Sequence, residues 1–142
     1  MTDPAVTTEH ATCIALGDRG ILLCGKPGSG KSDLALRLID GGATLVSDDQ
    51  TILERRGERV LCAPPGTIAG KLEVRGLGII SMEHRTASLG LVVDLVGPDE
   101  IERLPEIGHV AYLGLEFPLL PMNPFEASAA AKLRIAVSRL LR

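Results

Sequence analysis

One eight-residue loop limits the possible folds of this chain more than any other feature of its sequence. The loop consists of Gly25, Lys26, Pro27, Gly28, Ser29, Gly30, Lys31 and Ser32. It matches the phosphate-binding pattern G-x4-G-K-[ST] at every fixed position. An apolar run ends at Cys24 and an amphipathic pattern begins at Lys31, so the loop lies between an expected strand and an expected helix. The sequence therefore predicts an α/β domain that binds a nucleoside triphosphate.

Each part of this phosphate loop has a chemical role. The glycines let the backbone curl until successive N–H groups converge on phosphate oxygens. Lys31 opens the helix and can reach the β- and γ-phosphates. The hydroxyl of Ser32 can occupy one coordination position of Mg²⁺, which otherwise keeps water and phosphate oxygens. ATP and Mg²⁺ are therefore the expected cofactors, with all eight loop residues binding the nucleotide and Ser32 binding the metal.

The rest of the chain predicts a mixed sheet with two helices, from short apolar or alternating runs and from helical spacing. The expected strands are Ala11–Leu16, Ile21–Cys24, Thr44–Asp48, Thr51–Arg55, Arg59–Ala63, Lys71–Arg75, Leu89–Val96 and Ala111–Phe117. The expected helices run from Lys31 to Asp40 and from Glu126 to Leu141. Pro118, Pro121 and Pro124 are expected to bound the last strand. Since 142 residues suit one domain, residues 1–142 are expected to form a single P-loop domain.

The composition argues against several classes of protein. The net charge is −3 and the 15 Lys and Arg residues are scattered, which disfavours a nucleic-acid binder. No apolar run approaches the roughly 20 residues of a membrane span, and the polar first ten residues do not resemble a signal peptide. Three widely spaced cysteines without CxxC spacing are typical of reduced thiols. We therefore expect a cytoplasmic protein that binds neither membrane nor nucleic acid.

Two consecutive aspartates, Asp48 and Asp49, end the strand that follows the phosphate-loop helix. A right-handed crossover returns this strand beside or near Ile21–Cys24, so its carboxyl end points toward the phosphates. Because strand side chains alternate, only one aspartate easily faces the reaction, and the other orders the loop or a metal-bound water. Asp94 competes for the metal, because it ends an apolar run as a Walker-B aspartate does. The alternatives are that Asp48 and Asp49 are a solvated turn at a strand end and that Asp94 is a polar residue in the last part of a buried strand.

Glu73 and Arg75 lie two residues apart on an expected strand and therefore share one face. Aimed at one spot, a carboxylate and a guanidinium can bind a metal and a phosphate together. The alternative is an ion pair on the surface of an edge strand, which would contribute little to stability. His10, His84 and His109 are expected by default to be surface histidines.

Three stretches taken together resemble the bacterial HPr kinase/phosphorylase family: Gly25–Ser32, Leu45–Asp49 and above all Leu72–Ile80, which is similar to that family's signature. The resemblance runs from about His10 to Ile80 and is traceable to the C-terminus. It implies a P-loop domain related to phosphoenolpyruvate carboxykinase, assembled as hexamers. It also implies phosphorylation of a serine on the phosphocarrier protein HPr, which many members reverse by phosphorolysis. The family's separate N-terminal domain is absent, so we expect a short, catalytic-domain-only form that is a homo-oligomer.

The resemblance also implies roles for individual residues. The family's catalytic positions fall on His10, Lys31, Asp49 and, in the stretch Glu102–Pro105, on Arg103. The signature glutamate that binds magnesium falls on Glu73. On this interpretation Asp49 accepts the proton of the attacking serine, and Asp48 does not.

One departure from the family bears on the direction of the reaction. An arginine-rich stretch linked to dephosphorylation corresponds here to Leu120–Ala127, which contains no arginine. A kinase with weak or no phosphorolysis is therefore expected. Two other functions stay open at this point: a small-molecule kinase built on a P-loop, and a non-catalytic module that binds nucleotide and signals through a partner.

Overall fold

The computed structural model describes residues 5–103 and 106–141 of the chain. The strands are β1 (Val6–Glu9), β2 (Ala11–Leu16), β3 (Arg19–Cys24), β4 (Thr44–Ser47), β5 (Thr51–Arg56), β6 (Arg59–Ala63), β7 (Lys71–Val74), β8 (Gly78–Ser81), β9 (Ala87–Leu95), β10 (Gly108–Tyr112) and β11 (Leu115–Met122). The helices are α1 (Lys31–Asp40), the short 3-10 helix η1 (Pro98–Glu100) and α2 (Ala129–Leu140). Neither α1 nor α2, nor any other helix in these ranges, has the length and apolarity that crossing a membrane requires.

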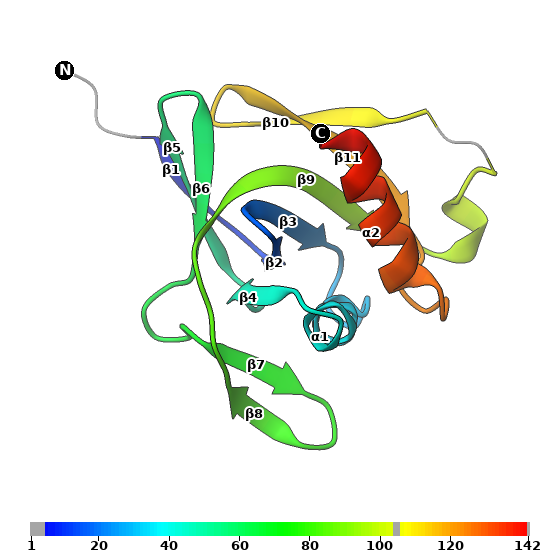
Figure 1. The fold of residues 1–142 in the computed structure, drawn as a ribbon, viewed down its shortest axis with the longest axis horizontal. Coiled ribbons are helices and arrows are strands. Elements are labelled where there is room, and N and C mark those ends of the chain that lie inside the picture. Colours follow the sequence, from blue (N-terminus) through cyan, green and yellow to red (C-terminus); the bar gives the residue numbers. More distant parts are fainter. Residues whose placement is uncertain (1–4, 104–105, 142) are drawn as a thin grey trace.

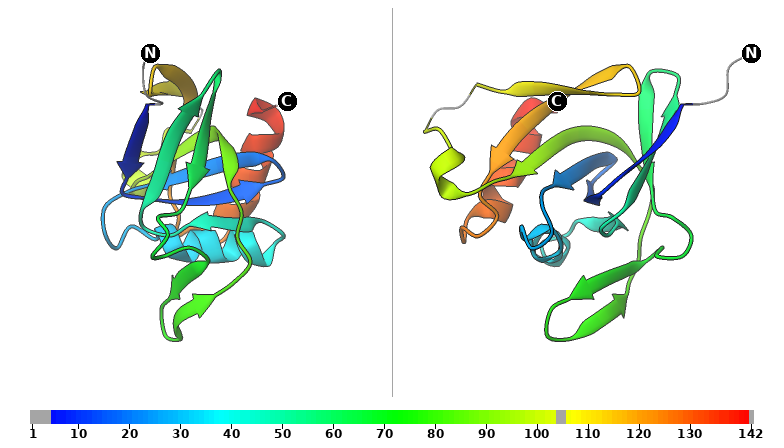
Figure 2. Two further views of the ribbon diagram at one scale, coloured as in Figure 1. Left: turned by 90° about the vertical axis from the view of Figure 1, so that its left-hand side faces the viewer. Right: turned by 180° about the vertical axis from the view of Figure 1, so that it is seen from behind.

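The strands form a curled mixed sheet centred on β3 and β9 (Figure 1). Most of the sheet follows the order β1-β5-β6-β9-β3-β2-β4. β9 pairs in parallel with β3 along one side, and its other side pairs with β6 near its start and with β11 near its end. β7 and β8 form a separate two-stranded hairpin that projects from the rest of the molecule (Figure 2). The predicted α/β class, with a mixed sheet, a phosphate-loop helix and a C-terminal helix, is confirmed.

Alternate residues of the central strands pack on opposite faces of the sheet. On β3, Ile21 and Leu23 pack in a cluster with α1 and α2, whereas Leu22 packs in a second cluster with residues of β5 and β6. All three side chains are fully buried, which explains why this strand is a continuous apolar run rather than an alternating one. The curl of the sheet closes the second cluster, on the face that α1 and α2 do not cover (Figure 2).

The prediction of one strand over Ala111–Phe117 is wrong, because the chain reverses in the middle of this range. β10 and β11 are an antiparallel pair that turns at Leu113 and Gly114, with φ of 54° and 86°. Two positive φ angles are typical of a tight hairpin turn, but a leucine rarely adopts one. Arg55 Nη1 holds this turn by donating to the Leu113 carbonyl at 3.0 Å. The turn therefore depends on a distant side chain rather than on a local sequence signal.

The prolines that were expected to bound this strand lie partly inside it. Pro118 pairs with β10 before the pairing with β9 begins, and Pro121 pairs with β9 after the pairing with β10 has ended. Each proline thus lies where β11 has a partner on one side only, and a proline without an N–H is tolerated at such edge-like positions. The expected end of the strand at Pro118 is therefore wrong.

Other boundaries differ from the sequence prediction in smaller ways. β1 and β8 were not expected, because β1 has one large apolar residue, Val6, and all four residues of β8 are exposed. α2 begins at Ala129 rather than at Glu126. The residues before Ala129 form a turn whose carbonyls, at Pro124 and Glu126, accept hydrogen bonds from Arg37.

Candidate active site

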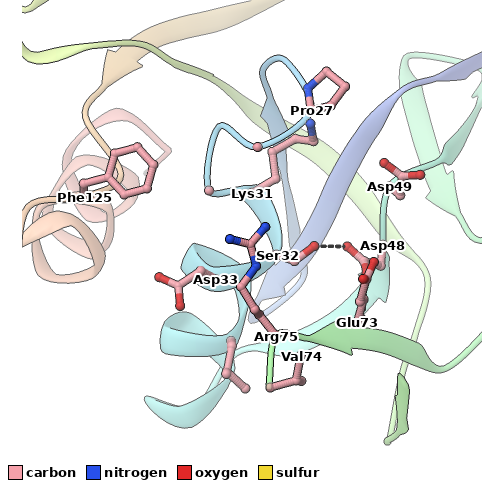
Figure 3. Close-up of a pocket in the computed structure, with 13 residues that line it drawn as sticks. Pro27, Lys31, Ser32, Asp33, Asp48, Asp49, Glu73, Val74, Arg75 and Phe125 are labelled. Atoms are coloured by element: carbon pink, nitrogen blue, oxygen red, sulfur yellow. Dashed lines mark hydrogen bonds between the residues drawn. The ribbon is translucent and has the colours of Figure 1, made fainter. Parts of the chain in front are cut away.

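A cleft of about 510 Å³ opens where the phosphate loop, the end of β4 and strand β7 meet (Figure 3). β3 and β4 are both antiparallel to β2, so they run in the same direction and their carboxyl ends reach the same edge of the sheet. β4 is thus near β3 as predicted, with β2 between them. The cleft is lined by Pro27, Gly28, Gly30, Lys31, Ser32, Asp33, Leu36, Asp48, Asp49, Glu73, Val74, Arg75 and Phe125.

At two positions of the phosphate loop, the backbone has a conformation that only glycine adopts easily. Gly28 and Gly30 have φ of 80° and 96°. A Cβ on Gly25 would lie 2.4 Å from the hydroxyl oxygen of Ser29, so this position excludes larger residues. Lys31, only 8% exposed, folds back so that its Nζ donates to the carbonyls of Gly25 at 2.7 Å and Lys26 at 3.2 Å. The amine is therefore held directly at the mouth of the loop.

The hydroxyl of Ser29 is the buried side-chain polar atom that lacks a hydrogen-bond partner among the described residues. An unpaired buried hydroxyl costs free energy, and such groups normally have a partner. Ser29 lies against Gly25 and outside the lining of the cleft, so this hydroxyl does not itself face a ligand. The side chains that fit a bound polyphosphate are those of Lys31 and Ser32, which do line the cleft.

Asp48 connects the phosphate loop to the strands around it. Its Oδ1 accepts hydrogen bonds from the hydroxyls of Ser32 at 2.7 Å and Thr12 at 3.0 Å. Its Oδ2 accepts the backbone N–H of Glu73 at 3.0 Å. The carboxylate is only 7% exposed, so burial and three donors hold it in one orientation. Because Ser32 donates its proton to Asp48, the lone pairs of its hydroxyl oxygen stay available for a cation.

Asp49 is exposed at the same edge of the cleft, in the left-handed backbone region with φ of 65°. Its N–H donates to the hydroxyl of Thr12 at 3.1 Å, which ties this backbone to the residue that also holds Asp48. Within the described ranges no donor bonds its carboxylate. Asp48 therefore orders the loop around it, whereas the carboxylate of Asp49 has no such donors; which of the two faces the reaction stays a prediction.

Glu73 and Arg75 both line the cleft, Glu73 on β7 beside Asp48 and Arg75 in the turn that follows this strand (Figure 3). Because β7 ends at Val74, the predicted strand face shared by Glu73 and Arg75 is wrong. Among the described residues they form no ion pair with each other, so the surface ion pair is not the arrangement found. Carboxylate and hydroxyl oxygens are the ligands that Mg²⁺ prefers, usually one or two from the protein with phosphate oxygens beside them. Ser32 and Glu73 therefore fit a magnesium–phosphate site, and Arg75 fits an anion beside it.

Three other candidates lie outside the lining of the cleft. His10 is exposed in the bend between β1 and β2, and Arg103 is exposed after η1. Asp94 is exposed on β9 beside Cys24 and Tyr112, on the face that carries Val92. Burial is the main cause that raises the pKa of the Cys24 thiol to about 11. The negative charge of Asp94 also raises the Cys24 pKa. Asp94 thus lies near Cys24 and outside the lining of the cleft that contains Ser32.

Sequence reasoning missed three residues of the site. Thr12 carries no motif, and its link to both aspartates arises only when β2 and β4 pair. Arg37 was recognised only as the partner of Asp33, a pair that forms at 3.1 Å, whereas it also binds the loop before α2. Phe125 was noted only as part of a segment without arginines. An aromatic residue directly after Pro124, in a chain with only two Phe, was the one available signal.

Comparison with known proteins gives a consistent result. Residues 4–108 match the family described as HPr Serine kinase C-terminal domain. Among curated relatives, the HPr kinase/phosphorylase of Chlorobium phaeobacteroides (strain BS1) is 32% identical, covering 81% of this chain and 38% of its own length. That of Chlorobaculum tepidum is 34% identical, covering 94% of this chain and 44% of its own. This chain thus spans about two fifths of the length of these relatives.

Among solved structures, the Hpr(Ser) kinase/phosphatase from Coxiella burnetii has the same fold, with a TM-score of 0.81. The match covers 93% of this chain and 94% of that chain at 24% sequence identity.

Proposed function

Because this chain belongs to the family of HPr serine kinase C-terminal domains, we propose that it is an ATP- and Mg²⁺-dependent kinase that phosphorylates a serine of HPr. One observation carries the proposal: Asp48, Asp49 and Glu73 line the same cleft as the phosphate loop. The hydrogen bond of 2.7 Å from Ser32 to Asp48 joins these acidic groups to the loop. A site for nucleotide alone would not need a free carboxylate beside the terminal phosphate.

In the proposed reaction, the serine hydroxyl oxygen forms a bond to the γ-phosphorus, and the bond from that phosphorus to the β–γ bridging oxygen breaks. Asp49 accepts the hydroxyl proton, and ADP leaves. Lys31, the loop N–H groups and Arg75 offset the negative charge of the transferring group. Mg²⁺ held by Ser32 and Glu73 would supply further positive charge to the phosphates. Arg103 and His10 are proposed as catalytic residues that approach the cleft from outside its lining, on the resemblance alone.

The test is transfer of labelled phosphate from ATP to HPr of the same organism in the presence of Mg²⁺. The matched control is HPr with its target serine replaced by alanine. Label on HPr but not on the control supports the proposal. Label on a small metabolite instead would favour a small-molecule kinase, and ATP binding without any transfer would favour a regulatory module.

Phosphorolysis is proposed to be weak, because inorganic phosphate and phosphoserine are both anionic and need cations nearby. In the segment before α2, Asn123 accepts the N–H of Phe125 and Glu126 pairs with Lys132, so neither adds positive charge to the cleft. The measurement is pyrophosphate release from phosphoserine-HPr at millimolar phosphate. Release as fast as the forward reaction contradicts this part of the proposal.

We also propose a cytoplasmic homo-oligomer. The free thiols of Cys13, Cys24 and Cys62 suit a reducing compartment. The oligomer follows the resemblance alone, and sedimentation of the purified chain tests it: a monomer at micromolar concentration contradicts the expectation.

A further inference from the structure

An exposed aromatic ring lies at one end of the cleft. The chain has only one Tyr and two Phe. Phe117 is buried and Tyr112 is half-buried, whereas Phe125 is 71% exposed and lines the cleft. Leaving such a ring in water has no benefit for the fold. Its place beside the phosphate loop therefore calls for a functional explanation.

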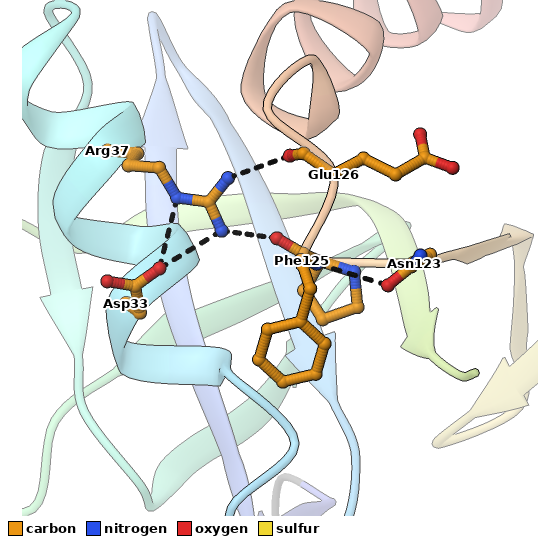
Figure 4. A network of polar contacts seen from close by, with 6 residues as sticks. Asp33, Arg37, Asn123, Phe125 and Glu126 are labelled. Carbon is orange, nitrogen blue, oxygen red and sulfur yellow. Dashed lines mark hydrogen bonds and ion pairs between the residues drawn. The ribbon is translucent and has the colours of Figure 1, made fainter. Parts of the chain in front are cut away.

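The backbone that carries the ring is held in position (Figure 4). Arg37 donates to the carbonyls on both sides of it, at Pro124 and Glu126. The N–H of Phe125 itself donates to Asn123 Oδ1 at 3.1 Å. Two donor contacts from Arg37 thus fix the segment to α1, and two contacts with Asp33, within the helix, orient its guanidinium.

The same ring lies against the phosphate loop. A Cβ on Gly30 would meet the ring carbon Cε1 at 3.3 Å and the Pro124 ring at 3.3 Å. The ring therefore packs against the phosphate loop at Gly30, where a larger side chain would crowd it. The largely exposed ring therefore lines the cleft on an anchored backbone.

The cleft has two chemically different ends (Figure 3). Asp48, Asp49 and Glu73 lie at one end, where a metal ion and the terminal phosphate belong. Phe125 lies at the other end, with Lys31 between the two. A nucleoside triphosphate whose γ-phosphate lies near Asp49 runs across the loop with its base at the opposite end. The base is then next to the phenyl ring.

We propose that Phe125 is the stacking surface for the nucleobase of the bound triphosphate, and that Arg37 positions it. This inference rests on the proposed function, because it assumes that a nucleotide occupies the cleft. Stacking on an aromatic face accepts any base, since every base has a π-face. The ring therefore adds affinity for a nucleotide over a bare polyphosphate without selecting one base.

The experiment compares two ligands that differ only in the nucleoside. Binding of Mg²⁺-ATP and of Mg²⁺-tripolyphosphate is measured by calorimetry for the unmodified chain, Phe125→Ala and Phe125→Trp. Removing one stacked base–aromatic contact typically lowers affinity by roughly 5- to 150-fold. We expect Phe125→Ala to lose affinity for ATP in this range, to keep its affinity for tripolyphosphate, and Phe125→Trp to keep both. Ile135→Ala, which removes an exposed apolar side chain on α2, is the matched control.

The possible failures are distinguishable. If the unmodified chain binds tripolyphosphate and ATP but Phe125→Ala weakens both equally, the ring only supports the loop and the inference is wrong. If Phe125→Ala binds ATP normally but needs more HPr for half-maximal rate, the ring contacts the protein substrate, which also overturns it. If the unmodified chain binds neither ligand, the nucleotide site itself is wrong and the proposed function fails with it. Thermal unfolding of each variant confirms that it is folded.

Discussion

At the scale of single residues, Thr12 links the two aspartates of the cleft. Its buried hydroxyl donates to Asp48 and accepts from the N–H of Asp49, so one oxygen orients both carboxylates. Thr12→Val keeps the shape and removes the oxygen. We expect the turnover rate to fall by roughly 10- to 100-fold, the cost of misplacing a reacting group, while ATP affinity changes little. Thr12→Ser restores the hydroxyl and should restore the rate. Kinetics with HPr check this, and a loss of stability with normal turnover would leave Thr12 a structural residue only.

The two neighbouring aspartates should respond differently to the same change. Asp49→Asn removes the proposed base, so the rate should fall by about 10²–10⁴-fold with stability unchanged. Asp48→Asn replaces one acceptor oxygen by an amide donor, so the side chain can no longer accept from Thr12, Ser32 and the N–H of Glu73 together. We expect it to lower the free energy of unfolding by about 1–3 kcal/mol. Urea denaturation and HPr phosphorylation measure the two effects. The opposite assignment of rate and stability losses would show that Asp48 is the base.

At the scale of elements, α1 and the segment before α2 depend on Arg37. Its guanidinium binds Asp33 and two backbone carbonyls at once, which a lysine ammonium cannot reproduce in the same geometry. Arg37→Lys should lower the free energy of unfolding by about 1–2 kcal/mol. Arg56→Lys is the matched control, because Arg56 forms an exposed pair with Glu54 that is worth at most about 1 kcal/mol. Equal effects of the two substitutions in thermal or urea unfolding would contradict a special role for Arg37.

At the scale of the whole molecule, stability should fall at alkaline pH. Burial is the main cause that raises the pKa of Cys24 from 9.0 to about 11, and it also raises the pKa of Cys13 and of Tyr112, which faces Cys24, Glu9 and Asp94. A pKa raised by folding means that the folded state favours the neutral form, so its contribution is complete below pH 9 and is lost as pH rises.

The free energy of unfolding should therefore fall continuously from about pH 9 to pH 11, the two pKa values of Cys24 in the unfolded and folded states. Cys24→Ala removes one of the responsible groups and should make this fall less steep. Urea denaturation series at several pH values measure it. Constant stability between these pH values would contradict the argument.

The amino-acid sequence alone determined the strand, phosphate loop and helix from Ile21 to Asp40. Helix α1 has the predicted bounds, because its hydrogen bonds and its apolar periodicity involve residues only a few positions apart. The pair Asp48–Asp49 directly after a strand and the place of Glu73 on a strand were also predictable, whereas Arg75 lies in the turn after β7 and not on the predicted strand. The roles assigned to these residues remain predictions.

Tertiary structure alone decided the contacts that join these pieces. Thr12 meets Asp48 across 36 positions of sequence, Glu73 meets Asp48 across 25, and Arg37 meets Pro124 across 87. The turn at Leu113 also depends on a contact between residues far apart in the sequence, since Arg55 of β5 donates to the Leu113 carbonyl. Local patterns carry no information on such partners, because each contact exists only after the curled sheet has brought distant strands together. The phosphate loop was therefore predictable, whereas the buried hydroxyl behind its carboxylates and the aromatic ring at its end were not.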